Sequence, residues 1–229
     1  MHMSTKQEIF TLLGGRVKMH RGLYNPTSDA VWLAAFAPTG CATILDVGVG
    51  TGGVSLCMHA HTPNAKITGI DTSQTMLESC AQNAQLNNAA LELINADIYS
   101  WRTSRTFDVV VTNPPYFYGT PALHNAHHNS DLSLWVSRCI ARVRPMGTFC
   151  IITDAATIGT VVSVMATKLG DITIFPLFGA KSTAERVLIS GRLGTRGMGV
   201  LHRGLPMNYE PVLRDGLTIS KALGKVSDA

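Results

Sequence analysis

The 229-residue sequence has little cysteine, and its few cysteines are scattered. They are odd in number and form no C-x-x-C pair: Cys41, Cys57, Cys80, Cys139 and Cys150. This spacing argues against a disulfide framework and against a zinc ribbon, and it favours a reducing compartment. We therefore expect five small buried side chains, no bound metal and a cytoplasmic protein.

Long apolar runs and low-complexity tracts are also missing. No stretch approaches the roughly 18 apolar residues of a membrane span, and residues 1–7 are too polar for a secretory signal. Hydrophobic residues make up 45% of the chain and charged residues 15%, which excludes a disordered chain and supplies one substantial core. A net charge of +4 is compatible with a polyanionic partner but does not identify one. No patterned interface helix stands out, so we expect a monomer without membrane contact.

Short β-rich apolar runs alternate with segments of helical period. Seven strands are predicted, at Thr43–Val47, Lys66–Ile70, Leu91–Asn95, Phe107–Thr112, Gly147–Ile152, Asp171–Phe175 and Arg186–Ser190. Helix-length segments separate most of them, which indicates parallel pairing with right-handed crossovers. The last two are joined by a shorter segment without helical period, which favours an antiparallel last strand. The predicted fold class is α/β: a mostly parallel seven-stranded sheet with helices on both faces.

Three segments are expected along the chain. Residues 1–40, with a helix over Asp29–Phe36, would form an N-terminal cap on the substrate side. Residues 41–192 would form a Rossmann-like cofactor-binding domain. Residues 193–229, where the periodicity fades, would form a C-terminal extension packed on the same domain.

A glycine turn, Leu45–Gly53, follows the first predicted strand. Its glycines permit a tight turn and close approach of a ligand, and the following helix start offers free N–H groups. Gly48, Gly50 and Gly53 satisfy the G-x-G-x-x-G spacing of dinucleotide sites. Asp71, about 20 residues further on, can accept both hydroxyls of a ribose. This feature fits NAD and S-adenosylmethionine equally well.

Two acidic residues favour S-adenosylmethionine over a dinucleotide. Asp46 lies two residues before the first glycine, where methyltransferases commonly place an acid. Asp97 follows the third strand and can take the amino group of the cofactor adenine, while Ile98 packs on its ring. The predicted cofactor contacts are Asp46, Gly48, Gly50, Gly52, Asp71, Asp97, Ile98 and Asn113.

The motif Asn113-Pro114-Pro115-Tyr116-Phe117 follows the fourth strand. Two prolines fix φ and remove two N–H donors, so Asn113 Oδ1 and the Pro114 carbonyl become fixed acceptors for a planar –NH2 group. Tyr116 supplies an aromatic face for the ring that carries this group. Two hydrogen bonds to fixed acceptors would raise the electron density of the nitrogen and aim it at a sulfonium methyl group. We predict direct N-methylation without a metal, with Asn113, Pro114, Pro115 and Tyr116 as catalytic residues.

These motifs resemble those of class I S-adenosylmethionine-dependent methyltransferases with an N-P-P-Y signature, most of all the bacterial tRNA adenine-N6 methyltransferases acting on valine tRNA. The resemblance extends to Leu13–Val17, Tyr24, Ala184–Leu188 and Leu201–His202. It implies transfer of a methyl group to N6 of an adenine in the anticodon-loop region of a tRNA. By resemblance, Asn113 would bind the target amino group.

The resemblance also implies contacts with the RNA substrate. Tyr116 and Phe117 would contact the flipped base, whose extrusion from a single-stranded loop costs little. Basic residues that can contact phosphates fall in two groups: Lys6, Arg16, Lys18 and Arg21 near the N-terminus, and Arg192, Arg196 and Arg203 near the C-terminus.

Two tryptophans and a histidine cluster are not assigned to the site. Trp32 and Trp135 fit the apolar faces of helices, which predicts core positions and not base stacking. The cluster His124, His127 and His128 lacks a carboxylate or cysteine at matching spacing, so no metal site is predicted there.

Other functions fit parts of this pattern. The glutamine amide of peptide-chain release factors presents the same two N–H donors, although enzymes of that kind usually carry a longer N-terminal domain. The small-subunit rRNA guanine-N2 methyltransferases also act on an exocyclic amine. A non-catalytic binding scaffold would leave Asn113 idle, and a dehydrogenase would need a proton donor for which the sequence offers no candidate.

Overall fold

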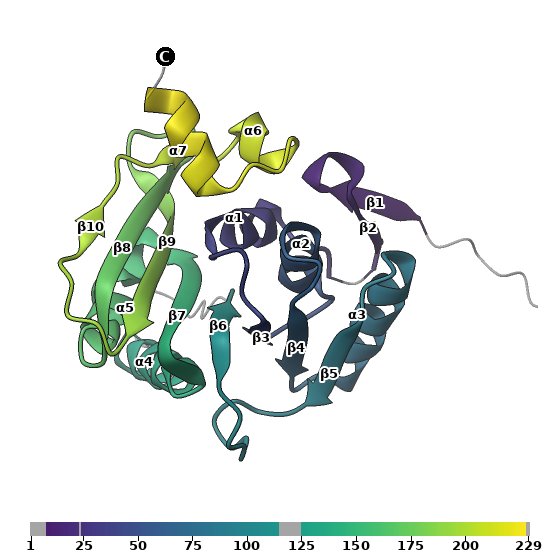
Figure 1. Ribbon diagram of the computed structural model, residues 1–229, viewed down its shortest axis with the longest axis horizontal. Coiled ribbons are helices and arrows are strands. Elements are labelled where there is room, and N and C mark those ends of the chain that lie inside the picture. Colours follow the sequence, from purple (N-terminus) through teal and green to yellow (C-terminus); the bar gives the residue numbers. More distant parts are fainter. Residues whose placement is uncertain (1–7, 23, 115–124, 228–229) are drawn as a thin grey trace, which may run out of the picture.

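A nine-stranded sheet organises the computed structural model, which describes residues 8–22, 24–114 and 125–227 (Figure 1). Its strands are β3 (Thr43–Val47), β4 (Lys66–Asp71), β5 (Leu91–Asn95), β6 (Phe107–Thr112), β7 (Val143–Asp154), β8 (Leu169–Phe178), β9 (Ala184–Leu193), β10 (Val200–Leu201) and β11 (Leu205–Pro206). The spatial order is β10-β8-β9-β7-β6-β3-β4-β5, and β11 also pairs with β8.

Only β9 runs against its neighbours, since it pairs antiparallel with both β7 and β8 while the other pairs of this sheet are parallel. The predicted mostly parallel sheet with an antiparallel last strand is therefore confirmed for the seven long strands. The predicted number of strands was too low. The additional strands β10 and β11 have two residues each, too few to leave a period in the sequence.

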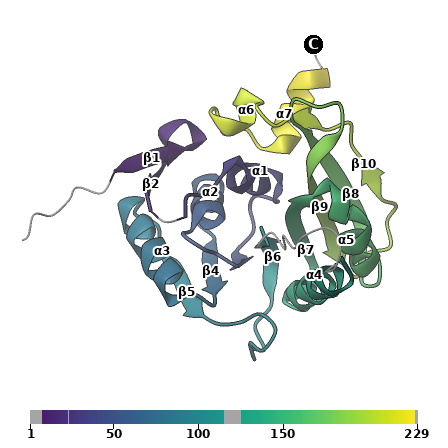
Figure 2. The same ribbon diagram turned by 180° about the vertical axis from the view of Figure 1, so that it is seen from behind.

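Helices cover both faces of the sheet, and α4 and α5 pack together on one of them (Figure 2). They are α1 (Ser28–Phe36), α2 (Gly53–His61), α3 (Gln74–Leu86), α4 (Asn125–Ile140), α5 (Ile158–Met165), α6 (Glu210–Leu213) and α7 (Ile219–Ser227), with 3-10 turns η1 (Leu13–Gly15) and η2 (Ala155–Thr157). Side chains of each strand alternate between the faces. In β6, Val109 and Val111 join the core cluster on the α1 and α2 side, whereas Val110 joins that of α4 and α5.

The connection between β7 and β8 is only partly α-helical. A 3-10 turn precedes α5, and α5 ends at Met165. Beyond it, the amides of Thr167 and Lys168 donate to the carbonyls of Val164 and Met165, three residues back. This tightening ends the helix, and apolar periodicity alone does not reveal it.

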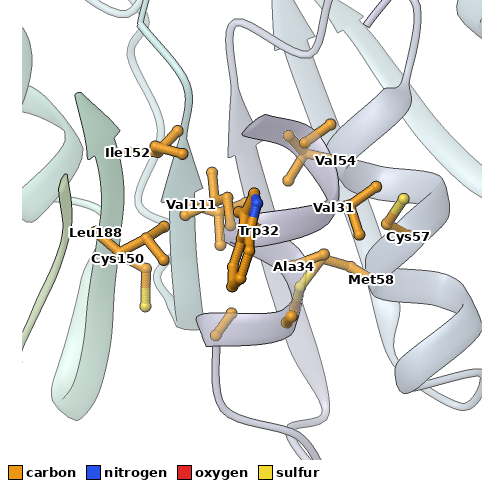
Figure 3. Close-up of a cluster of buried hydrophobic side chains, with 14 of the residues drawn as sticks. Val31, Trp32, Ala34, Val54, Cys57, Met58, Val111, Cys150, Ile152 and Leu188 are labelled. Carbon is orange, nitrogen blue, oxygen red and sulfur yellow. The ribbon is translucent and has the colours of Figure 1, made fainter. Parts of the chain in front are cut away.

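Trp32 of α1 lies at the centre of the larger core cluster and is fully buried. Figure 3 shows it among side chains of α1, α2 and the strands, labelled Val31, Ala34, Val54, Cys57, Met58, Val111, Cys150, Ile152 and Leu188. Its indole Nε1 donates to the Met207 carbonyl at 3.1 Å, so the C-terminal segment is joined to the same core. The predicted core position of Trp32 is confirmed.

The cysteines also follow the prediction, with one exception. Cys57, Cys80, Cys139 and Cys150 are buried and free, while Cys41 is half-buried. Burial raises the pKa of the Cys57 thiol to about 12, so this group stays protonated and acts as a small apolar side chain.

A hairpin of β1 (Ile9–Leu12) and β2 (Val17–His20), which the sequence did not predict, precedes α1. Its strands have four residues each and are joined by the tight turn η1. Leu13 in this turn and Val212 near the C-terminus belong to the same core cluster as Trp32. The two terminal segments therefore share a hydrophobic core with the central sheet. None of the helices in the described ranges combines the length and apolar character that crossing a bilayer requires.

Candidate active site

A cavity of about 510 Å³ lies at the carboxyl ends of β3, β4, β5 and β6. It is lined by Tyr24, Val47, Gly48, Gly50, Ile70, Asp71, Thr72, Ser73, Met76, Ala96, Asp97, Ile98, Asn113, Pro114 and Trp135. The chain leaves β3 toward β4 but leaves β6 toward β7, so the direction of the connections reverses between the neighbouring strands β3 and β6. Open parallel sheets bind ligands at such a switch point, outside the carboxyl ends of the strands.

The glycine turn after β3 folds over the end of β4. The amides of Gly48 and Val49 both donate to the Ile70 carbonyl, at 2.9 and 3.0 Å. Gly48, Gly50 and Gly52 have φ values of 75°, 54° and 93°, in the left-handed region that favours glycine. This conformation turns the backbone of Gly48 and Gly50 toward the cavity.

Asp71, the last residue of β4, has both carboxylate oxygens anchored to the backbone. Oδ2 accepts from the Gly50 N–H and Oδ1 from the Ser73 N–H, each at 2.9 Å. These bonds fix the orientation of the carboxylate at the cavity wall. A carboxylate has about four lone-pair sites, so both oxygens can still accept from a ribose diol.

Asp97 and Ile98 line the cavity beyond the end of β5. Asp97 Oδ1 accepts from the Tyr99 N–H at 2.9 Å, which holds the carboxylate at the start of a turn. Ile98 is 3% exposed and packs with Val47 and Ile70 in one core cluster. A carboxylate beside an apolar wall suits the amino group and the ring face of an adenine.

Asn113 and Pro114 follow β6 and line the same cavity. Since β3 separates β6 from β4, they approach the cavity from the side opposite Asp71. The predicted residues Pro115, Tyr116 and Phe117 lie outside the described residues, as does His124. The cavity thus joins a wall suited to a nucleoside with the two predicted acceptors of a target amine.

Two of the predicted cofactor contacts, Asp46 and Gly52, are not among the residues that line the cavity. Asp46 is 1% exposed and its Oδ2 accepts from the Ser55 hydroxyl of α2 at 2.7 Å. Burial raises the pKa of this carboxyl from its ordinary 3.8 to about 7. A side chain on Gly52 would place its Cβ 2.7 Å from Cys80 Sγ. Asp46 therefore joins the end of β3 to α2, and Gly52 packs against Cys80 of α3. Direct contact of these two residues with a cofactor stays a prediction.

The predicted phosphate contacts Arg16, Lys18 and Arg21 also lie outside the cavity lining. Arg16 donates to the carbonyls of Leu13 and Asp215, so its guanidinium joins the hairpin to the C-terminal segment. Lys18 is exposed, and the exposed Arg21 pairs with an exposed carboxylate, that of Glu8, at 3.1 Å. The sequence could not show the contact of Arg16, because Asp215 is 199 positions away.

Trp135 is the main cavity residue that the sequence did not assign to the site. The prediction placed it in the core, but it is only half-buried and lines the cavity. Its ring meets the Tyr99 ring edge-on, with centroids 5.8 Å apart, and its Nε1 donates to Thr112 Oγ1 at 3.1 Å. Helical period indicates that one face of α4 is covered, but it does not tell a core position from a cavity wall.

Seven further cavity residues were also unassigned, and three of them lie around the start of α3. Thr72, Ser73 and Met76 lie at and just before the start of α3, where the Ser73 hydroxyl caps the helix by accepting from the Met76 N–H. Within the described part of the chain, no three His, Cys, Asp or Glu side chains gather closely enough to hold a metal ion.

The lining of the cavity fits S-adenosylmethionine. Its volume lies within the range of roughly 300–1,000 Å³ typical of small-molecule sites. The anchored Asp71 carboxylate suits the ribose diol, and Asp97 with Ile98 suits the adenine. The glycine turn offers backbone groups to the remaining amino-acid part.

Comparison with known proteins places this site in a family. Residues 28–170 match the family model described as the methyltransferase small domain. A tRNA1(Val) (adenine(37)-N6)-methyltransferase of Glaesserella parasuis is 33% identical over 101 residues, which cover 43% of each chain. A release factor glutamine methyltransferase of Lactococcus lactis is 36% identical over 96 residues, which cover 40% of this chain and 35% of the relative. The chain spans about half the length of the curated relatives it matches.

Solved structures agree in fold. A predicted O-methyltransferase from Agrobacterium tumefaciens superposes with a TM-score of 0.65 at 21% sequence identity, over 79% of this chain and 88% of the other. The architecture is therefore that of the class I methyltransferases. Together with the match over residues 28–170, the glycine turn and the Asn113-Pro114 wall, this shows that the chain belongs to the methyltransferase small-domain family.

Proposed function

We propose that the protein transfers the methyl group of S-adenosylmethionine to the exocyclic N6 amino group of an adenine in the anticodon-loop region of a tRNA. One observation carries the reaction type: Asn113 and Pro114 line the same cavity as Asp71 and Asp97. Support for the RNA substrate comes from relatives named as tRNA adenine-N6 methyltransferases.

The residues of the β3–β5 side would bind the cofactor. Asp71 would accept from the ribose hydroxyls, and its bond to the Gly50 N–H keeps the carboxylate oriented for this. Asp97 would accept from the adenine amino group, with Ile98 against the ring. Gly48 and Gly50 would let the backbone approach the cofactor closely.

The residues of the β6 side would hold the target. Asn113 Oδ1 and the Pro114 carbonyl would accept the two N–H bonds of the amino group, which directs the nitrogen lone pair into the cavity. When bound, S-adenosylmethionine supplies an electrophilic methyl group. As positive charge develops on the nitrogen, both acceptors stabilise it through the two N–H bonds, and the acidified N–H proton then passes to solvent water. As predicted from the sequence, Pro115 would keep the acceptors rigid, Tyr116 would stack on the base and Phe117 would contact the substrate.

Exposed basic residues near the N-terminus would bind the RNA backbone. Lys18 and Arg21, both exposed, would contact RNA phosphates near the cavity residue Tyr24. Residues 1–40 would act as a substrate-side cap, residues 41–192 as the cofactor-binding domain, and residues 193–229 as an extension on the same core. We further propose that the protein acts as a cytoplasmic monomer without a metal.

A second candidate substrate is the glutamine amide of a peptide-chain release factor. The relative from Lactococcus lactis carries that activity in its name, and a carboxamide –NH2 offers Asn113 and Pro114 the same two donors. The guanine N2 amine of rRNA is a third substrate with this geometry.

Methyl-labelled S-adenosylmethionine with two substrate pools tests the proposal. Unmodified tRNA and unmethylated release factors are incubated separately with the protein, and the digested nucleosides and peptides are analysed by mass spectrometry. We expect the label in N6-methyladenosine. Label in N5-methylglutamine would identify the release factor amide, and not RNA, as the substrate. Label in N2-methylguanosine would identify guanine, and not adenine, as the target base.

The matched control in this experiment is Asn113→Ala. At equal enzyme concentration and time it should give on the order of 10²-fold less label while still binding S-adenosylhomocysteine in calorimetry. A tRNA transcript with inosine in place of the target adenosine lacks the amino group and should stay unlabelled. Wild-type labelling by Asn113→Ala, or label in the inosine transcript, would contradict the assigned target nitrogen.

A further inference from the structure

The last residues of β3 and β6 lie side by side above the cavity. Val47 and Thr112 are partners in the parallel pairing of these strands. Val47 leads directly into Gly48, on the cofactor side, and Thr112 leads directly into Asn113, on the target side. The separation of the two halves of the site is therefore set at this pair.

Two hydrogen bonds join the pair to α4. The Trp135 indole Nε1–H donates to Thr112 Oγ1 at 3.1 Å, and the Thr112 hydroxyl donates to the Val47 carbonyl at 2.9 Å. An indole N–H can only donate, so the hydroxyl must accept from it and direct its own proton to Val47. Thr112 has no exposed surface, which protects both bonds from exchange with water.

Trp135 also contacts the cofactor side of the cavity directly. The edge of its indole lies beside Gly48, where an added Cβ would be 3.5 Å from Cζ2 and 3.6 Å from Cη2. Its ring packs edge-on against Tyr99, two residues after Asp97. One side chain thus spans the glycine turn, the end of β6 and the loop after β5.

We propose that Thr112 and Trp135 are positioning residues that form a clip, Trp135–Thr112–Val47, holding Asn113 at a fixed distance from the cofactor turn. The inference rests on the proposed function, because the clip matters only if a nitrogen held by Asn113 must meet a methyl donor held beside Gly48. Nucleophile and methyl group must come within reacting distance, and a misplacement of about 1 Å can cost about 10²-fold in rate.

Isosteric variants test the clip. Thr112→Val keeps the shape of the side chain but removes the hydroxyl, and Thr112→Ser keeps the hydroxyl. We expect Thr112→Val to lower kcat roughly 10- to 100-fold, with KM for the substrate and Kd for S-adenosylhomocysteine within about threefold of wild type. Thr112→Ser should recover most of kcat. Thr68→Val is the matched control: it removes another buried hydroxyl, which bonds to Glu92 away from the cavity.

Trp135→Phe tests the other bond of the clip, because it keeps an aromatic ring but removes the N–H donor. It should lower kcat, and the double variant with Thr112→Val should lose little more than Thr112→Val alone, since both changes break one chain of bonds. All assays are run well below the melting temperature of each variant.

A spectroscopic measurement separates the clip from the proposed function. The three tryptophans are replaced by 5-fluorotryptophan and the protein is measured by fluorine NMR. The signal that is missing in Trp135→Phe belongs to Trp135. In the cofactor-free protein, Thr112→Val should shift this signal and Thr112→Ser should leave it near the wild-type position. An unmoved signal in Thr112→Val, or a kcat within twofold of wild type, would overturn the clip. A wild-type protein that methylates neither pool would instead refute the proposed function, and the fluorine signals would still decide whether the bonds exist.

Discussion

Asp71 Oδ2 accepts the Gly50 N–H at 2.9 Å, which joins the end of β4 to the glycine turn that follows β3. The acid that we assign to the ribose is therefore also a structural partner of the turn. Its second oxygen is held by Ser73, at the start of α3. Cofactor affinity and the conformation of the turn should depend on the same carboxylate.

Asp71→Ala should weaken cofactor binding more than it slows turnover. Hydrogen bonds to a charged group contribute about 1.5–3 kcal/mol each, so we expect Kd for S-adenosylhomocysteine, measured by calorimetry, to rise at least roughly tenfold. At saturating S-adenosylmethionine, kcat should be affected less. Glu78→Ala, an exposed carboxylate of α3, serves as the control, and an affinity unchanged in Asp71→Ala would refute the ribose assignment.

Asn113→Ala should show the opposite pattern. Loss of one acceptor for the developing positive charge should lower kcat by on the order of 10²-fold, while Kd for S-adenosylhomocysteine stays near the wild-type value. Steady-state kinetics and calorimetry measure the two effects. The exposed Asn64, in the turn before β4, provides an Asn→Ala control with wild-type behaviour. Equal losses of kcat and cofactor affinity in Asn113→Ala would remove the residue from its assigned role.

Substitution of Gly52 should mainly lower stability, whereas substitution of Gly50 should mainly weaken cofactor binding. Gly52→Ala places a Cβ against Cys80 Sγ at positive φ, so it should cost about 1–3 kcal/mol in the free energy of unfolding. A Cβ on Gly50 would meet no atom within 4 Å outside its chain neighbours, and Gly50 lines the cavity, so Gly50→Ala should weaken S-adenosylhomocysteine binding with a smaller loss of stability. Urea unfolding and calorimetry on both variants test this, and the reverse pattern would restore Gly52 as a cofactor contact.

Asp46 should make stability depend on pH. The folded protein holds the Asp46 proton up to a pKa of about 7, whereas the unfolded chain releases it near 3.8. The folded state therefore binds more protons between these values, and stability falls as pH rises through this window, by at most about 1.4 kcal/mol per pH unit. Asp46→Asn keeps an acceptor for the Ser55 hydroxyl and should remove this contribution. Urea unfolding of both proteins between pH 4.5 and 8 measures the difference, and parallel stability curves would contradict the raised pKa.

Asn83 should couple the N-terminal hairpin to the site. It is 1% exposed, its Oδ1 accepts from the His20 N–H, and its Nδ2 donates to the Thr51 carbonyl in the glycine turn, both at 2.9 Å. Asn83→Ala leaves two buried backbone groups unpaired, at about 1–3 kcal/mol each. Chemical unfolding should show this loss, and hydrogen exchange should show faster exchange of the His20 amide. Asn87→Ala, which removes a less buried contact with Lys18, should cost less. Equal effects of the two substitutions would argue against a special role of Asn83.

The cavity residues that the sequence predicted correctly in position share one property. Gly48, Gly50, Asp71, Asp97 and Asn113 all follow or end a parallel strand, and the carboxyl ends of neighbouring parallel strands meet at one edge of the sheet. Once the strands and their parallel pairing are recognised, the convergence of these residues follows. Their chemical roles stay predictions until the variants are measured.

The structure gives Asp46 a partner that the sequence did not indicate. It alternates with Leu45 and Val47, which belong to the α4 and α5 side of the core, so its own side chain must lie on the opposite side. There it meets Ser55 of α2 and becomes buried. The cofactor contact predicted for Asp46 stays a prediction.

The sequence alone therefore determined the seven long strands with their mostly parallel pairing, the glycine turn and the acceptors that follow β6, because these depend on local φ preferences, apolar period and strand direction. Only the tertiary structure decided that Trp135 lines the cavity through its bond to Thr112, and that Arg16 binds the Asp215 carbonyl. Both contacts join segments far apart in the chain. A helical or strand period states which face of an element is covered, and only the packed fold specifies the group that covers it.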